Sequence, residues 1–322
     1  MTIAVRAEAL AKNFGDVVAL ERVDFEVPIG TVFGLLGPNG AGKTTTVRIL
    51  STILAPDAGT AEVLGLDIVR DAAQIRSLIG LAGQFAAVDP NLTGRENLRL
   101  VGRLAHIDRP YVLSQADDLL ERFGLTHAAD RPVRTYSGGM RRRLDLAAAL
   151  VHRPPVLFLD EPTTGLDIHG RSELWDMIRE LVAGETTVLL TTQYLEEADR
   201  LADSIAVVDE GRVIAYDTPS ALKAKLGNTV IELGFGAAEQ ATSALAALDG
   251  SAVGIERENE VLRVTSNGGA RDLMDVLRAL DAVGMEPSTL SVRDPSLDDV
   301  FLKLTGRHAE SVSAPDGEGA TG

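Results

Sequence analysis

The chain has 322 residues, of which 45% are hydrophobic and 24% charged, so it is long enough for a large core and about two domains. Its formal net charge of −16 argues against a protein that neutralises nucleic-acid phosphates, and we expect no nucleic-acid partner. The lack of cysteine excludes disulfides, thiolate metal sites and cysteine nucleophiles. No run approaches the roughly 18 apolar residues of a spanning helix, and the start lacks an apolar leader, so we expect neither a membrane span nor secretion.

Residues 1–226 alternate between strand and helix patterns. Strands are predicted at residues 3–7, 17–20, 23–27, 31–36, 156–159, 187–191 and 205–208. The early alternating strands favour an antiparallel edge sheet, whereas the continuous apolar run 31–36 is typical of a buried strand and leads through a glycine turn into a helix at 44–54. A helical subdomain is predicted at about 90–151. The alternation predicts an α/β fold with a mostly parallel sheet core.

The remaining chain has a different pattern. Strands are predicted at 229–233, 253–256, 261–265 and 289–292, and helices at 237–248 and 270–283. This order predicts a small α+β domain over residues 227–308. The final stretch, 309–322, contains too few apolar residues to fold, and we expect a disordered tail there.

A glycine-rich segment matches the pattern G-x-x-x-x-G-K-[ST] of a phosphate-binding loop. Its residues are Gly37, Pro38, Asn39, Gly40, Ala41, Gly42, Lys43 and Thr44, and Thr45 follows in the predicted helix. Glycines allow backbone amides to turn toward phosphate oxygens, Lys43 would reach the β- and γ-phosphates, and the Thr44 hydroxyl would coordinate Mg²⁺. An ordinary glycine turn is the alternative, but the strand before it and the helix after it favour a site for ATP.

Two acids follow the apolar strand at 156–159, at the strand end where open α/β sheets bind ligands. Asp160 is a candidate for holding Mg²⁺, and Glu161 is a candidate general base that polarises the attacking water. A solvated strand end is the alternative for the pair when it is considered alone. The phosphate-binding loop makes a catalytic role the better interpretation.

The segment Tyr136–Met140 contains Ser137, Gly138 and Gly139 between these two motifs. In this order the motifs resemble those of ATP-binding cassette (ABC) proteins. The resemblance implies that Ser137, Gly138 and Gly139 grip the γ-phosphate of a nucleotide bound mainly to a second copy of the chain. Tyr136 and Met140 depart from the usual leucine and glutamine of this signature.

Further positions match the family over about residues 1–225. Gln84 resembles the glutamine that touches Mg²⁺ and the attacking water and leads into the segment facing a membrane partner. Phe14 resembles the aromatic residue that stacks on adenine, with a core phenylalanine as the alternative. The segment Thr164–Asp167 resembles the loop that contacts the opposite subunit.

Gln193 occupies the position where the family usually carries a catalytic histidine. Its amide can hydrogen-bond a γ-phosphate and orient water, but it cannot take up a proton near neutral pH. Proton handling would then rest on Glu161 or solvent. A cassette that no longer hydrolyses ATP is the alternative, although Lys43, Asp160 and Glu161 are all present.

Residues 83–98 and 292–301 together resemble the daunorubicin/doxorubicin resistance subfamily of ABC ATP-binding subunits. The resemblance implies an ATPase on the cytoplasmic face of the cell membrane that drives drug or antibiotic export through a separate permease, with residues 227–308 regulating or dimerising it. Export of a lipid, polysaccharide or other endogenous product is the main alternative. A soluble ABC ATPase acting on DNA or ribosomes is another alternative, disfavoured by the single cassette, the lack of cysteine and heptads and the negative charge. A P-loop small-molecule kinase is a third, disfavoured by Ser137, Gly138 and Gly139.

Overall fold

The computed structural model describes the chain apart from residues 1, 84–87, 227–228, 249–253, 267–268 and 306–322. The expected tail at 309–322 lies outside the described residues. The chain divides into two compact units, Met1–Asp217 and Thr218–His308. This division precedes the expected boundary between residues 226 and 227, because helix α8 (Pro219–Ala224) packs on α11 (Leu297–Thr305) of the second unit.

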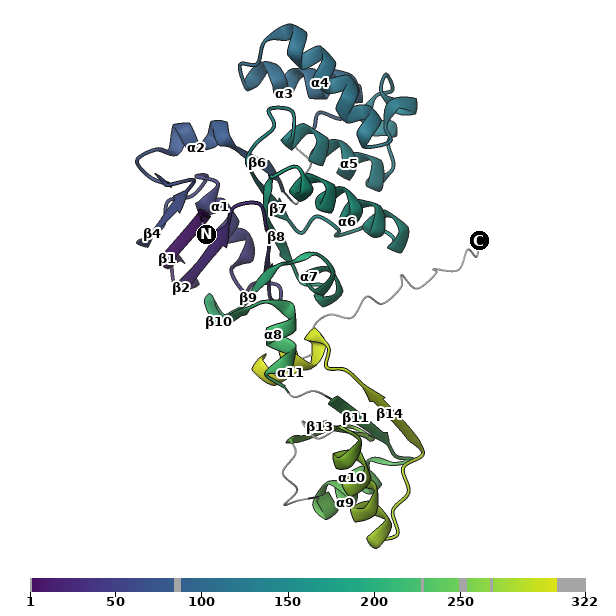
Figure 1. Ribbon diagram of the computed structural model, residues 1–322. Coiled ribbons are helices and arrows are strands. Elements are labelled where there is room, and N and C mark those ends of the chain that lie inside the picture. Colours follow the sequence, from purple (N-terminus) through teal and green to yellow (C-terminus); the bar gives the residue numbers. More distant parts are fainter. Residues whose placement is uncertain (1, 84–87, 227–228, 249–253, 267–268, 306–322) are drawn as a thin grey trace. The chain divides into compact units, whose positions relative to one another are not determined.

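The first unit is built on one large mixed sheet (Figure 1). Its strands run in the order β5, β4, β1, β2, β10, β9, β3, β8, β7, β6. Their bounds are β1 Ile3–Phe14, β2 Val17–Pro28, β3 Val32–Leu36, β4 Ala58–Val63, β5 Leu66–Asp67, β6 Ile79–Ala82, β7 Val156–Asp160, β8 Thr187–Thr192, β9 Ser204–Asp209 and β10 Arg212–Asp217. Strands β6, β7, β8, β3 and β9 are parallel, whereas β1, β2, β4 and β5 pair antiparallel. The expected parallel core and antiparallel edge sheet are thus confirmed.

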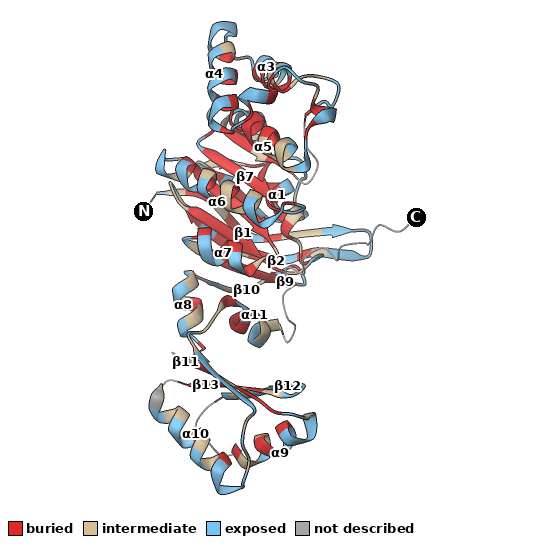
Figure 2. Ribbon diagram, turned by 90° about the vertical axis from the view of Figure 1, so that its right-hand side faces the viewer, coloured by how far each residue is buried: buried red, intermediate tan, exposed pale blue. Residues whose placement is uncertain are grey.

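The central parallel strands are buried on both faces, as Figure 2 shows. In β7, Leu157 and Leu159 join an apolar cluster with helices α5 and α6, while Val156 and Phe158 join a second cluster with α1 on the other face. Alternate side chains of a strand point to opposite faces, so a strand covered on both sides must be apolar throughout. Besides α5, the helices that pack on this sheet are α1 Lys43–Leu50, α2 Ala72–Leu78, α6 Ile168–Ala183 and α7 Leu195–Leu201.

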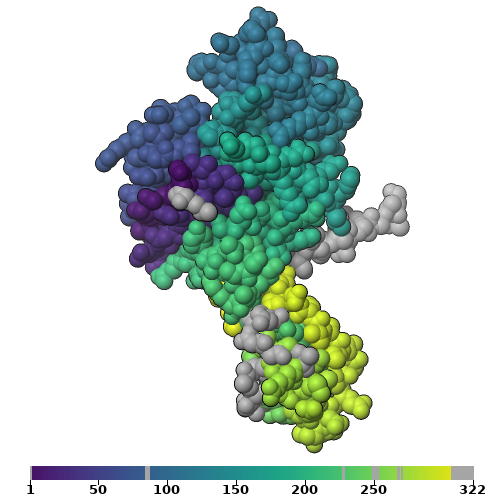
Figure 3. Space-filling model, in the orientation of Figure 1, coloured from purple at the N-terminus to yellow at the C-terminus, as the bar shows by residue number. Residues whose placement is uncertain are grey.

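The predicted helical subdomain contains α3 (Gly94–Leu104), α4 (Arg109–Arg122) and α5 (Gly138–Ala149), and α3 and α4 form the upper part of the first unit in Figure 3. Short 3₁₀ turns at Thr126–Ala128 and Val133–Thr135 join α4 to α5. Helix α3 begins with a capping box, in which Thr93 accepts from the Glu96 amide and Glu96 accepts from the Thr93 amide.

The second unit has a four-stranded antiparallel sheet in the order β12, β13, β11, β14. Its strands are β11 Thr229–Gly234, β12 Gly254–Glu258, β13 Val261–Ser266 and β14 Thr289–Arg293, and its further helices are α9 Ala238–Leu248 and α10 Ala270–Ala282. Helices α9 and α10 pack on the sheet face that carries Ile231, Leu233, Leu262 and Val264. Within the described part of both units, no helix is long and apolar enough to cross a membrane.

Candidate functional site

The loop between β3 and α1 turns sharply because two of its glycines adopt left-handed backbone conformations. Gly40 has φ 85° and Gly42 has φ 105°. A Cβ at Gly42 would also lie 2.5 Å from Leu20 Cδ2 and 2.7 Å from the Ala19 carbonyl oxygen, and a Cβ at Gly37 would collide with the Val208 carbonyl oxygen. Conformation and packing therefore both require glycine in this loop.

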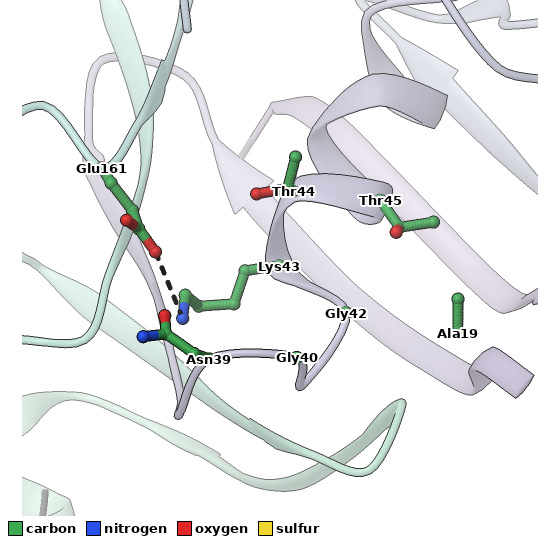
Figure 4. Close-up of a pocket in the computed structure, with 8 residues that line it drawn as sticks. All are labelled: Ala19, Asn39, Gly40, Gly42, Lys43, Thr44, Thr45 and Glu161. Atoms are coloured by element: carbon green, nitrogen blue, oxygen red, sulfur yellow. Dashed lines mark ion pairs between the residues drawn. The ribbon is translucent and has the colours of Figure 1, made fainter. Parts of the chain in front are cut away.

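Lys43 begins helix α1 and points back into the loop (Figure 4). Its Nζ donates to the carbonyl oxygens of Gly37 at 2.7 Å and Pro38 at 3.0 Å, and lies 3.6 Å from Glu161 Oε1. The residue is only 4% exposed, so these oxygens compensate a nearly buried ammonium group. The loop thus holds one positive charge at a fixed place.

A hollow of about 160 Å³ opens beside Lys43. It is lined by Ala19, Asn39, Gly40, Gly42, Lys43, Thr44, Thr45 and Glu161. All of these except Ala19 were predicted as site residues, although they come from the loop, from α1 and from the end of β7. The lining places a cation, hydroxyls and glycine amides around one space, which is a suitable environment for phosphate groups.

Asp160 ends strand β7 beside the start of α1. Its Oδ1 accepts hydrogen bonds from the hydroxyls of Thr44 at 3.1 Å and Thr191 at 2.7 Å. Asp160 and Thr191 are register partners on neighbouring parallel strands, so strand pairing brings them together. Thr191 was not predicted. The signal for it was a pair of threonines at the carboxyl end of the apolar strand 187–191, the same sheet edge as the predicted acids.

Glu161 follows Asp160 with φ 49°, a left-handed conformation that is costly for a residue with a side chain. Its amide donates to Thr191 Oγ1 at 2.9 Å and to the Thr191 carbonyl oxygen at 3.2 Å. The carboxylate points toward the Lys43 ammonium group, as Figure 4 shows. Strand β8 therefore helps to hold the backbone from which this carboxylate projects.

The end of β8 adjoins the phosphate-binding loop, since the Gly37 amide donates to the Thr192 carbonyl oxygen at 3.3 Å. Gln193 follows, and its amide oxygen is buried without a hydrogen-bond partner among the described residues. Four residues on, Glu197 is fully buried and accepts a hydrogen bond from Trp175 Nε1 at 3.1 Å. Burial raises the pKa of Glu197.

The serine–glycine–glycine motif lies at the start of α5, away from the lining of the hollow. Ser137 caps the helix by accepting from the Met140 amide at 3.2 Å. Ser137 and Gly138 are exposed, and a Cβ at Gly138 would meet open space. Tyr136, which replaces the usual leucine, is buried and donates from its hydroxyl to the Ala128 carbonyl oxygen at 2.7 Å.

Comparison with known proteins identifies the family. A family model described as ABC transporter matches residues 20–164, and one described as the ATP-binding protein DrrA1-3-like C-terminal domain matches residues 218–305. A daunorubicin resistance ATP-binding protein of Streptomyces coeruleorubidus is 53% identical, with 94% of this chain and 96% of that protein covered. The chain belongs to the ABC transporter ATP-binding proteins. The resemblance expected from the motifs is thereby confirmed.

Other ABC ATP-binding proteins support the same assignment. A daunorubicin/doxorubicin resistance ATP-binding protein of Streptomyces peucetius is 45% identical over 98% of this chain and 96% of that protein. A Nod factor export ATP-binding protein of Ralstonia nicotianae is 40% identical over 95% of each. A solved Clostridium perfringens structure, described as part of an ABC transporter complex, superposes with a TM-score of 0.64 at 27% identity and covers 70% of this chain and 92% of that one. The fold is therefore that of an ABC ATPase cassette.

Among the other predicted positions, Phe14 and the segment Thr164–Asp167 do not line the hollow. Phe14 ends β1 with 48% of its surface exposed and carries Lys12 Nζ at 5.7 Å from its ring centroid, so the alternative of a core phenylalanine is wrong. The segment Thr164–Asp167 joins β7 to α6, where Asp167 caps the helix by accepting from the Gly170 amide at 2.8 Å. Gln84 lies outside the described residues.

Proposed function

We propose that this chain is the ATP-hydrolysing subunit of an ABC exporter that moves a drug or antibiotic through a separate membrane permease. The observation that carries the proposal is the convergence of Lys43, Glu161 and the Asp160–Thr44 pair on one hollow beside a glycine loop. A cation, a carboxylate next to it and a hydroxyl–carboxylate pair are the groups that ATP hydrolysis requires.

The residues divide this work. The amides of residues 37–44 and the Lys43 ammonium group would bind the phosphates, and Lys43 would exchange its contacts with the loop carbonyls for phosphate oxygens. Phe14 would stack on adenine from its exposed position. Glu161 would accept a hydrogen bond from the attacking water and polarise it, with Gln193 orienting that water or the γ-phosphate.

The oxygen atoms of Thr44 and Asp160 suit Mg²⁺, because a hydroxyl and a carboxylate already meet 3.1 Å apart at the edge of the phosphate loop. When bound, Mg²⁺ would neutralise charge on the β- and γ-phosphates. We assign a contribution from Gln84 on the family resemblance alone.

The exposed Ser137 and Gly138 support a two-copy mechanism. They lie apart from the lining of the chain's own hollow and leave an unobstructed helix N-terminus, which favours the phosphate of a nucleotide held by a second copy. ATP would join the two copies, and hydrolysis would let them separate. The unit Thr218–His308 would regulate or stabilise this pairing.

The decisive test is the Glu161→Gln variant, which keeps the size of the side chain and removes the base. It should bind ATP and elute as a stable dimer in size-exclusion chromatography with Mg-ATP. Its ATPase rate should fall at least about 100-fold. Gln193→Ala should lose less. Glu185→Gln, a change at an exposed loop glutamate, is the matched control and should behave like the unaltered protein. Near-normal hydrolysis by Glu161→Gln, or a monomer at high concentration with Mg-ATP, would overturn the proposal.

The cargo is tested separately. The relatives named for daunorubicin or doxorubicin resistance, at 53% and 45% identity, favour drug export, whereas the Nod factor export relative at 40% supports export of an endogenous product as the second candidate. The chain and its permease should be expressed together in a drug-sensitive host. Reduced daunorubicin accumulation that is restored by substitution of Lys43 would support drug export. Unchanged accumulation despite membrane-bound ATPase activity would favour export of an endogenous product.

A further inference from the structure

Arg142 lies on α5, five residues after Ser137, and its guanidinium group reaches across to the end of β7. Nε donates to the Pro162 carbonyl oxygen at 2.7 Å, and one terminal nitrogen donates to those of Asp160 at 3.1 Å and Glu161 at 3.0 Å. The other terminal nitrogen donates to the Gly83 carbonyl oxygen. The side chain is 12% exposed. One guanidinium group thus donates hydrogen bonds to three consecutive carbonyl oxygens and to a fourth in the segment after β6.

The turn at Asp160–Pro162 needs such a partner. Glu161 is left-handed, which turns it out of the strand, and Pro162 has no amide hydrogen to offer. Buried carbonyls without donors are destabilising, and a left-handed non-glycine residue persists only where its surroundings determine it. Arginine is the side chain with enough donors, in a planar fork, to meet these carbonyls together.

Glu161 is consequently held on both sides of its backbone. Thr191 of β8 accepts from its amide, and Arg142 of α5 donates to its carbonyl oxygen. We propose that Arg142 is a positioning residue that fixes the turn carrying Glu161 and thereby aims its carboxylate for hydrolysis. The proposal rests on the proposed function, because it takes Glu161 as the base.

The surroundings of Arg142 keep its charge in place. Asp145 Oδ2 lies 3.6 Å from a terminal nitrogen, one turn along the same helix. Burial lowers the pKa of Arg142, and the carboxylates of Asp145 and Asp160 oppose that effect. Arginine remains protonated near neutral pH, so the fork keeps its donors under working conditions.

The test compares Arg142→Lys with the unaltered full-length chain. Lysine keeps the charge but cannot span the four carbonyls, so kcat should fall about 10- to 100-fold while the Kd for ATP, measured with a fluorescent ATP analogue, stays within about twofold. The matched control is Arg143→Lys on the same helix, where the charge pairs with Glu173 at 3.5 Å. Its kcat should be unchanged.

Chemical rescue of kcat distinguishes a residue that positions Glu161 from one that only stabilises the fold. Arg142→Ala should regain part of its lost kcat when millimolar guanidinium is added, and methylammonium should not restore it. A kcat for Arg142→Lys within twofold of the unaltered chain, or a parallel loss of ATP binding and kcat without rescue, would overturn the proposal. If the unaltered chain hydrolyses no ATP, or Glu161→Gln hydrolyses it normally, the proposed function fails instead.

Discussion

The two units use buried and partly buried polar side chains for different purposes. In the first unit, the buried Lys43 lines a hollow, while Asp160 and Thr191 lie at the carboxyl ends of two neighbouring parallel strands and hydrogen-bond to each other. In the second unit, Arg293 and Asp299 link strand β14 to helix α11. Polar groups thus line or adjoin a hollow in one unit and join secondary-structure elements in the other. A substitution among these groups of the first unit should therefore affect activity, and a substitution in the Arg293–Asp299 pair should affect stability.

The network in the second unit is dense. Arg293 donates to both carboxylate oxygens of Asp299, at 2.6 and 2.9 Å, and to Glu232 Oε1 at 2.9 Å. The same Glu232 oxygen accepts from Arg263 at 3.1 Å. Asp299 also accepts from the amide and hydroxyl of Ser296, and its own amide donates to the Ser296 hydroxyl oxygen at 3.3 Å, so the two residues cap the start of α11 reciprocally. Strands β11, β13 and β14 and helix α11 are joined through these charges.

Among the substitutions that distinguish the two units, Thr191→Val is expected to have the largest effect. Thr191→Val keeps the shape of the side chain but removes the hydroxyl that donates to Asp160 and accepts from the Glu161 amide. We expect kcat to fall about tenfold or more, because each lost hydrogen bond of this kind is worth about 1 kcal/mol or more in the transition state. Steady-state ATPase assays measure it.

A threonine at the other end of the same strand provides the control. Thr187 is also buried, and its hydroxyl oxygen accepts from the Gly30 amide at 2.9 Å. Thr187→Val should destabilise the unit similarly and leave kcat unchanged. Equal loss of kcat in both variants would mean that Thr191 acts only through stability. Thr191→Ser, which retains the hydroxyl, should remain active.

The second effect is expected at Asp299, where stability should change and ATP hydrolysis should not. Asp299→Asn removes the charge that pairs with Arg293 and should destabilise the second unit by about 1–3 kcal/mol. Trp175 is the only tryptophan of the chain, so its fluorescence reports on the first unit, and hydrogen exchange of the β11 and β14 amides reports on the second. Asp275→Asn, at an exposed position on α10, is the control.

The acid sensitivity of this variant is a further check. Burial alone would raise the pKa of Asp299, but hydrogen bonds from Arg293 and Ser296 outweigh it and lower the pKa from 3.8 to about 2. The contribution to stability is therefore complete above about pH 4 and is lost as the pH falls toward 2. The difference between the unaltered chain and Asp299→Asn should shrink over that window. A constant difference would contradict the role of the ionised carboxylate.

The smallest effect is expected at an ion pair on the surface of the first unit. Arg6 Nε lies 2.8 Å from Glu26 Oε1, and both side chains are more than a third exposed. Glu26→Gln should change the free energy of unfolding by less than about 0.5 kcal/mol, because solvent screens exposed pairs. Urea denaturation followed by Trp175 fluorescence measures it. A loss comparable to that of Asp299→Asn would show that burial does not distinguish the two pairs.

The sequence predicted the parts of the cassette that depend on local pattern. The apolar runs at 31–36 and 156–159 predicted buried strands, and the spacing of glycines before Lys43 predicted the phosphate loop. Strands β4, β5, β6 and β10 were missed. Strand β5 has only two residues and β4 is mostly exposed, so these two segments show little apolar alternation. The unit boundary also differed, since the packing of α8 on α11 joins residues more than seventy positions apart.

The supporting residues of the site were missed for a related reason. Thr191 acts on Asp160 only through the pairing of β7 with β8, and Arg142 acts through a side chain that spans from a helix to a turn. Neither relation produces a sequence spacing. A motif identifies the groups that touch a ligand, whereas the residues that hold those groups follow from tertiary contacts.

The phosphate loop also depends on the last hairpin of its unit. Gly211, in the tight turn between β9 and β10, donates its amide to the Ala41 carbonyl oxygen at 3.1 Å, and its own carbonyl oxygen accepts from the Glu21 amide at 2.9 Å. Residues near positions 20, 40 and 210 are thereby joined. Since these contacts are far apart in the chain, the loop reaches its final shape only after residue 211 has left the ribosome. During synthesis, competence to bind nucleotide therefore arrives late, when the first unit is almost complete.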